Sequence, residues 1–205
     1  MDEYRDSRNV LARVEATPEP YSGNAFMYVL AMAGPEDMLK VGMTRDPLAR
    51  WSAFHPRWFE AFDLDHSLLV ETETRADAQA LETALHRLLV EHQCPVPMTM
   101  RSAAGGATEW YRGAYSAARK FILKQELAGY IVHIDARSQL ERPMAVAREQ
   151  LFSVVNQAFE DRCSGWLSAA QLEVVHDMVD AQRAFFEDIK SVLPPHVCIE
   201  LGLHV

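Results

Sequence analysis

Three side chains that can act on a phosphate ester stand within the 25 residues from Phe26 to Arg50: Tyr28, Lys40 and Arg50 itself. The planar guanidinium of an arginine can pair with two phosphate oxygens at once. A lysine can contact phosphate, or act as a base when a nearby cation lowers its pKa. A tyrosine hydroxyl can position or activate a water molecule. Each also has an ordinary structural explanation, because strand tyrosines are often core residues and arginines often lie at the surface.

The pattern around these residues predicts a β-hairpin followed by a helix. Residues 26–32 alternate as a strand does, a Gly-Pro pair follows as a turn, and residues 38–43 form a second apolar run that pairs back. Asp46 is a suitable N-cap and Pro47 a suitable first helical residue, so Arg50 is expected within the first turns of a helix.

A third strand is predicted over residues 64–72, and a helix is predicted to follow it. Thr74 opens a capping-box pattern, and the helix extends to about His92. On this helix Glu82 and His86 stand four residues apart at the border of the apolar stripe. Between the first helix and the third strand, five aromatic residues are expected in the core rather than in an exposed base-stacking platform: Trp51, Phe54, Trp58, Phe59 and Phe62.

Short extended segments are predicted over residues 108–112 and 129–135, on either side of a helix over 115–127. Two long amphipathic helices, over 143–159 and 168–192, then close the chain. Their apolar stripes are expected to dock on the preceding core or to form a two-fold dimer contact.

Four fragments, in order, resemble the GIY-YIG nuclease superfamily, in the branch with a K-(I/V)-G-x-T second motif and a closing E-W-(F/Y). The fragments are Tyr28-Val29, Lys40-Val41-Gly42-Met43-Thr44 with Asp46-Pro47-Leu48-Ala49-Arg50, Leu81-Glu82 with His86, and Thr108-Glu109-Trp110-Tyr111. The resemblance covers rather under half of the chain. It implies a small, mainly antiparallel three-stranded sheet flanked by helices, an α+β fold, followed by a helical C-terminal unit.

The resemblance also implies a divalent-metal-dependent endonuclease that hydrolyses the phosphodiester bonds of DNA. The implied catalytic residues are Tyr28, Lys40, Arg50 and Glu82, and Glu82 is the implied ligand of Mg²⁺ or Mn²⁺. The residues expected to contact nucleic acid are Arg45, Arg119, Lys120 and Lys124, and the accessory candidates are Thr44, His86, Glu109 and Trp110.

The chain departs from the superfamily pattern at four places, of which the first, Phe26-Met27 in place of Gly-Ile, removes no chemical group. Lys40 replaces the second tyrosine of the motif, Phe54 stands where a histidine often follows the arginine, and the closing asparagine has no counterpart. A second interpretation therefore stays open, in which the fold persists as a catalytically drifted module that binds nucleic acid or a protein partner. Convergence of Tyr28, Lys40, Arg50 and Glu82 in one open cleft would distinguish the enzyme from this module.

The charge and the cysteine content of the chain limit which functions are possible. The net charge is −9, but residues 21–129 are close to neutral, with 13 acids against 11 bases, and residues 130–205 hold 11 acids against 6 bases. Such a balance argues against nonspecific coating of DNA and leaves room for a local grip on phosphate. Three widely separated cysteines and no membrane-length apolar segment predict a soluble cytoplasmic protein with buried thiols.

Three regions are therefore predicted: an N-terminal arm over residues 1–24, a nuclease-like domain over 25–129, and a mostly helical region over 130–205. The expected partner is nucleic acid, with DNA expected rather than RNA, and the C-terminal helices offer a surface for a homodimer.

Overall fold

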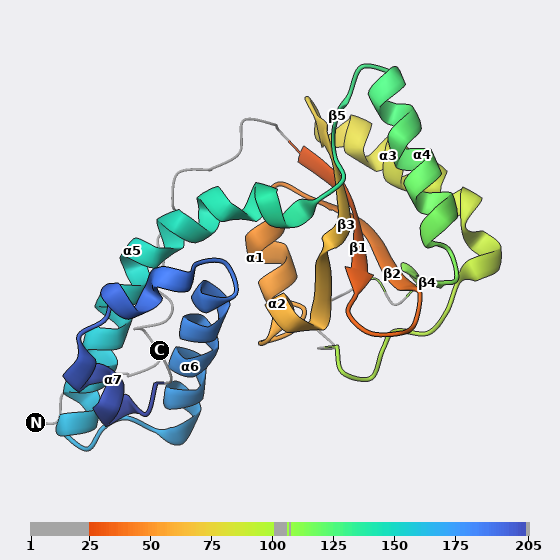
Figure 1. Ribbon diagram of the computed structural model, residues 1–205. Coiled ribbons are helices and arrows are strands. Elements are labelled where there is room, and N and C mark those ends of the chain that lie inside the picture. The colour runs from red at the N-terminus through yellow and green to blue at the C-terminus, as the bar shows by residue number, and fades with distance from the viewer. Residues whose placement is uncertain (1–24, 101–105, 107, 204–205) are drawn as a thin grey trace, which may run out of the picture.

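The computed structural model describes residues 25–100, 106 and 108–203 and shows an α+β fold (Figure 1). The predicted N-terminal arm lies outside the described residues. The strands are β1 (Ala25–Met32), β2 (Met38–Thr44), β3 (Phe62–Thr72), β4 (Trp110–Arg112) and β5 (Ile131–His133). The helices are α1 (Pro47–Ser52), α2 (Trp58–Ala61), α3 (Arg75–Leu88), α4 (Tyr115–Leu127), α5 (Ala136–Cys163), α6 (Ala169–Arg183) and α7 (Pro195–Leu201), with short 3₁₀ turns η2 (Val90–His92) and η4 (Glu187–Ser191).

The predicted hairpin is confirmed, and it forms the centre of the sheet. β1 pairs antiparallel with β2 so that Tyr28 lies opposite Gly42 and Leu30 lies opposite Lys40. β3 pairs antiparallel along the other side of β1. Side chains opposite each other in such a pair project from the same face of the sheet. Tyr28 and Lys40 therefore share one face.

The sheet has five strands, so the expectation of three strands was wrong. The order is β4-β2-β1-β3-β5, and every neighbouring pair is antiparallel. The two added strands come from the short extended segments near residues 110 and 131, each only three residues long. Segments this short carry too little alternation to reveal a partner strand.

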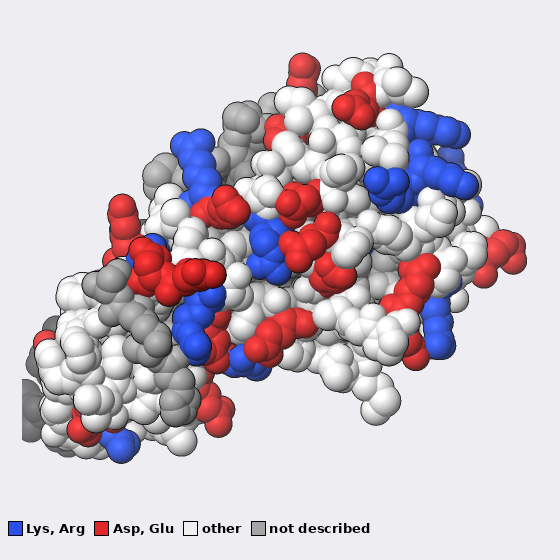
Figure 2. Space-filling view, in the orientation of Figure 1, with Lys and Arg blue, Asp and Glu red and all other residues white. Residues whose placement is uncertain are grey.

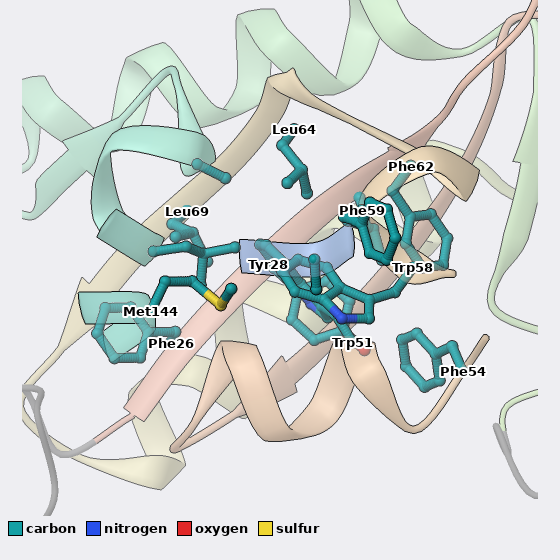
Figure 3. Packing of buried hydrophobic residues seen from close by; sticks show 14 of the residues in the cluster. Phe26, Tyr28, Trp51, Phe54, Trp58, Phe59, Phe62, Leu64, Leu69 and Met144 are labelled. Carbon is teal, nitrogen blue, oxygen red and sulfur yellow. The ribbon is translucent and has the colours of Figure 1, made fainter. Parts of the chain in front are cut away.

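Helices cover both faces of the sheet (Figure 1). On one face, α3 and α4 bury residues such as Ala78, Leu85 and Ile122 against the sheet. On the other face, α1, α2 and the start of α5 enclose an aromatic core that contains Tyr28. Figure 3 shows Tyr28 beside Trp51 in this core, with their ring centroids 5.8 Å apart in an edge arrangement. The predicted core role of the five aromatic residues is confirmed, since all of them are buried.

The C-terminal helices differ from their predicted bounds. α5 begins at Ala136, seven residues before the predicted start, and continues through Pro143. Asp135 caps this earlier start by accepting a hydrogen bond from the Ser138 backbone N–H. α6 ends at Arg183 instead of continuing to residue 192, and η4 and α7 follow it. Because proline usually marks a helix start, the sequence suggested a start at residue 143.

α5 joins the sheet to a separate helical core. Its first turns place Leu140 and Met144 against the aromatic core, and its later turns bury Leu151 and Val155 against α6 and α7. The C-terminal helices thus dock on the sheet as expected, whereas a dimer and the boundary after residue 129 stay predictions. No helix in the described part of the chain is long and apolar enough to span a membrane. Of the three thiols, Cys198 alone is fully buried; Cys94 is half-buried, and Cys163 is exposed, contrary to expectation.

Candidate active site

Arg50 lies on α1, a short and well-capped helix that places its side chain at the site. The Asp46 side chain accepts a hydrogen bond from the Ala49 backbone N–H at 3.0 Å, and Pro47 occupies the first helical position, as predicted. Arg50 stands in the last turn of α1, with its guanidinium 4.9 Å from the centroid of the Phe54 ring. It also donates a hydrogen bond to the hydroxyl of Tyr28.

Tyr28 lies over the backbone of the neighbouring strand, and this contact requires glycine at position 42. A Cβ atom built on Gly42 would overlap the hydroxyl of Tyr28. Tyr28 is 1% exposed, and burial raises its pKa well above the ordinary value, against the opposing effect of Arg50. In the metal-free protein the phenol is therefore neutral at physiological pH, and its hydroxyl can position a group by hydrogen bonding.

Lys40 is fully buried, and its charge is met by a carboxylate from a distant part of the chain. Its Nζ atom donates to Oε2 of Glu109 at 2.7 Å. It also lies 5.3 Å from the ring centroid of Phe54 and 5.4 Å from that of Trp110. Burial lowers the pKa of Lys40, while the hydrogen bond that Lys40 donates to Glu109 opposes this decrease. The register that pairs Lys40 with Trp110 brings this carboxylate to the site.

Glu82 reaches the site from α3 and is 7% exposed. Its Oε2 atom accepts a hydrogen bond from Nε2 of Gln79 at 2.7 Å. Its Oε1 atom lies 3.8 Å from Nε2 of His86. These neighbours are three residues before and four residues after Glu82, so one face of α3 supplies all three side chains.

These elements surround a hollow of about 530 Å³ at the end of the central strands. Tyr28, Arg50, Glu82 and Glu109 line it, whereas Lys40 is fully buried and is not part of the lining. Three arginines contribute to the wall: Arg45, Arg50 and Arg75. A second hollow of about 470 Å³ adjoins it, because both are lined by Gln79, Glu82 and Glu109. The two form one groove with the carboxylates at its middle.

The oxygen-rich middle of this groove fits a hard divalent cation. Two carboxylates, Glu82 and Glu109, and the hydroxyl of Tyr28 line the same hollow. Among the described residues no group of three or more His, Cys, Asp or Glu side chains could hold a metal ion. Mg²⁺ does not require such a group, because it keeps several waters and takes one or two carboxylates. Glu82 is the better ligand of the two, since Lys40 already engages Glu109.

The structure gathers most, but not all, of the predicted site residues. Thr44 and Arg45 line the hollow with Tyr28, Arg50 and Glu82, and His86 lines the adjoining hollow. Trp110 is fully buried against Lys40. The remaining predicted contacts with nucleic acid lie on α4, outside the lining of both hollows: Arg119, Lys120 and Lys124. Figure 2 shows Lys and Arg side chains gathered over α4.

Among the residues of the first hollow that sequence reasoning missed are two polar ones, Arg75 and Gln79. Both lie on α3, seven and three residues before Glu82. Helical periodicity places all three on one face, so extending the pattern backwards from Glu82 would have identified them.

Comparison with known families corrects the resemblance to GIY-YIG nucleases. The family model that matches is that of the T5orf172 domain, over residues 25–126, and no GIY-YIG match is found. The matched segment begins at β1 and ends in α4, so it contains every residue of the groove. No curated protein and no solved structure matches the chain.

Proposed function

We propose that the groove hydrolyses phosphodiester bonds of DNA in a reaction that depends on a divalent metal ion. The observation that carries the proposal is the convergence of Tyr28, Arg50 and Glu82 on one hollow from three separate elements. The T5orf172 domain is associated with nuclease-like and DNA-binding functions, which supports nucleic acid as the partner.

The charges of the groove suit a phosphate diester. Among the described residues, neither Arg45 nor Arg75 pairs with a carboxylate, although both line the hollow. Their guanidinium groups would hold the phosphates on either side of the scissile bond. The negative net charge of the protein is thus locally reversed at the wall of the groove.

Each residue has a distinct role in the proposed reaction. Arg50 grips the non-bridging oxygens of the scissile phosphate. The neutral hydroxyl of Tyr28 orients the attacking water. Glu109, held in place by Lys40, accepts the proton that this water loses. Glu82 would hold Mg²⁺ or Mn²⁺, and the ion would supply Lewis acidity for the charge that develops on the phosphate and on the leaving 3′ oxygen.

A plasmid-cleavage assay with Mg²⁺ or Mn²⁺ tests the proposal. Wild-type protein is expected to nick or cut the plasmid, and Glu82→Gln is expected to lower the rate by about 100-fold or more. The matched control is Glu141→Gln, an exposed glutamate on α5 remote from the groove. Loss of activity in both variants, or in neither, would contradict the assigned role of Glu82.

The buried state of Lys40 favours a second candidate, a module that binds nucleic acid without cutting it. A lysine that is 0% exposed and paired with Glu109 does not reach a substrate in the groove. This candidate predicts that wild-type protein binds DNA in a salt-dependent manner and leaves it intact with either metal. Arg45→Gln and Arg75→Gln would then weaken binding, while Glu82→Gln would leave it unchanged.

A further inference from the structure

Three side chains from α3 and β4 form a row that ends at the candidate metal ligand. His86 lies in the middle, with its Nδ1 atom 2.5 Å from the hydroxyl of Tyr111 and its Nε2 atom 3.8 Å from Oε1 of Glu82. The rings of His86 and Tyr111 are tilted against each other, with centroids 5.7 Å apart. Gln79 contacts the other oxygen of Glu82.

The hydroxyl of Tyr111 determines which nitrogen of His86 carries the proton. Tyr111 is 2% exposed, and a phenol ordinarily keeps its proton at physiological pH. The hydroxyl therefore keeps its proton, and a buried O–H must donate it to an acceptor. Among the described residues its hydrogen-bond partner is Nδ1 of His86. Nδ1 is then the acceptor, so the ring proton is on Nε2.

We propose that Tyr111 and His86 orient the carboxylate of Glu82 by presenting an N–H, rather than a lone pair, to its Oε1 atom. The separation of 3.8 Å is too long for a hydrogen bond, so the contact is electrostatic and its sign depends on the tautomer. The opposite tautomer would turn a lone pair toward a carboxylate. With Gln79 donating to Oε2, both oxygens of Glu82 face N–H groups.

This inference rests on the proposed function, because the orientation matters if Glu82 binds a metal ion. Groups that orient a metal ligand typically change metal affinity or activity by about 10- to 100-fold when they are removed. Tyr111 and His86 are positioning residues here, since neither is assigned a contact with substrate. A role confined to packing would leave the tautomer of His86 unaffected.

Nuclear magnetic resonance of the imidazole nitrogens tests the inference on the full, metal-free chain. In wild-type protein the His86 ring is expected as the Nε2–H tautomer, with two well-separated nitrogen shifts. In Tyr111→Phe the two shifts are expected to move toward each other as both tautomers become populated. Observation of the Nδ1–H tautomer in the wild type, or of an unchanged tautomer in the variant, would overturn the proposal.

Titration with Mn²⁺, followed by the electron paramagnetic resonance of the free ion, gives the second readout. Tyr111→Phe is expected to weaken binding by about 10-fold. The matched control is Tyr115→Phe, which removes a hydroxyl from a tyrosine on α4 whose ring lies near His66 and outside both hollows. It is expected to leave both the His86 tautomer and Mn²⁺ binding unchanged. Equal effects of the two variants would contradict the inference.

The two readouts separate failure of the inference from failure of the proposed function. If wild-type protein neither binds Mn²⁺ nor cleaves DNA, the proposed function is wrong, and the nitrogen shifts still decide whether Tyr111 sets the tautomer. If wild-type protein cleaves DNA while Tyr111→Phe keeps the tautomer and the Mn²⁺ affinity, the proposed function stands and the inference is wrong.

Discussion

Two hollows of similar size use charged side chains in opposite ways. The groove at the end of the central strands encloses about 530 Å³, and a hollow between α2, α6 and η4 encloses about 570 Å³. Both contain arginines and carboxylates. In the hollow at α2, Arg57 donates to Glu60, Asp177 and Asp180 at 2.6–3.0 Å. Its charges therefore satisfy one another.

The groove arranges its charges differently. Lys40 is buried among aromatic rings and reaches a single carboxylate, and Glu82 faces amide and imidazole nitrogens rather than a paired cation. Burying a charge costs free energy that an exposed ion pair does not incur. The charges in the hollow at α2 are explained by the docking of α6 on α2. The free-energy cost of burying charge at the groove is not explained by such a contact between helices. This difference supports the groove as the candidate functional site.

The same substitution placed in each hollow should separate the two roles most clearly. Arg50→Lys is expected to lower cleavage by about 100-fold with little change in stability, because a point charge does not reproduce a bidentate grip on phosphate. Arg57→Lys is expected to leave cleavage unchanged and to lower the free energy of unfolding by less than about 1 kcal/mol. Plasmid cleavage and thermal unfolding measure the two effects. If Arg57→Lys lowered cleavage and Arg50→Lys lowered only stability, the functional role would belong to the hollow at α2 and not to the groove.

Gly42→Ala should be destabilising, by about 1–3 kcal/mol, because its methyl group would force the ring of Tyr28 out of place. Urea unfolding measures the effect. The control is a double-mutant cycle with Tyr28→Leu, in which the same alanine should cost much less. An equal cost in both backgrounds would show that the contact between Tyr28 and position 42 is not what requires glycine.

The smallest expected effect concerns the ion pairs of the hollow at α2. Arg57 lowers the pKa of Glu60 below its usual value. A carboxyl group with a lowered pKa in the folded state stabilises the fold above its unfolded pKa of about 4.3, and this contribution is lost as the pH falls through the folded pKa. Wild-type protein should therefore lose more stability than Arg57→Gln between about pH 7 and about pH 3.

Glu60 is 57% exposed, so the difference should stay below about 1 kcal/mol. Thermal unfolding at the two pH values measures it. If the two proteins lose equal stability between the two pH values, Arg57 does not contribute to the acid dependence, and the ion pairs at this hollow do not stabilise the fold.

Local signals were sufficient to predict the elements that carry the site. Alternation located β1 and β2, Asp46 and Pro47 fixed the start of α1, and Thr74 fixed the start of α3. The position of the candidate residues on those elements followed directly from these starts. The helix over 115–127 was also predicted with the bounds that the structure shows.

Pairings between distant segments could not be predicted in the same way. Lys40 and Glu109 are 69 residues apart, and the strand that brings them together is three residues long. A three-residue strand gives no periodicity to recognise, and its partner is chosen by tertiary packing. The full burial of Lys40 and the five-stranded sheet both follow from that pairing. The placement of Arg119 and Lys124 outside the groove also depends on packing, because it follows from the face of the sheet that α4 covers.

The continuous course of α5 has a mechanical consequence. At about 1.5 Å per residue its 28 residues span about 42 Å, and its two halves belong to different hydrophobic cores. Neither core can rotate relative to the other without breaking backbone hydrogen bonds or exposing apolar surface. α5 therefore connects the C-terminal helices directly to the layer that packs on Tyr28. The helical region and the sheet should melt as a single cooperative unit.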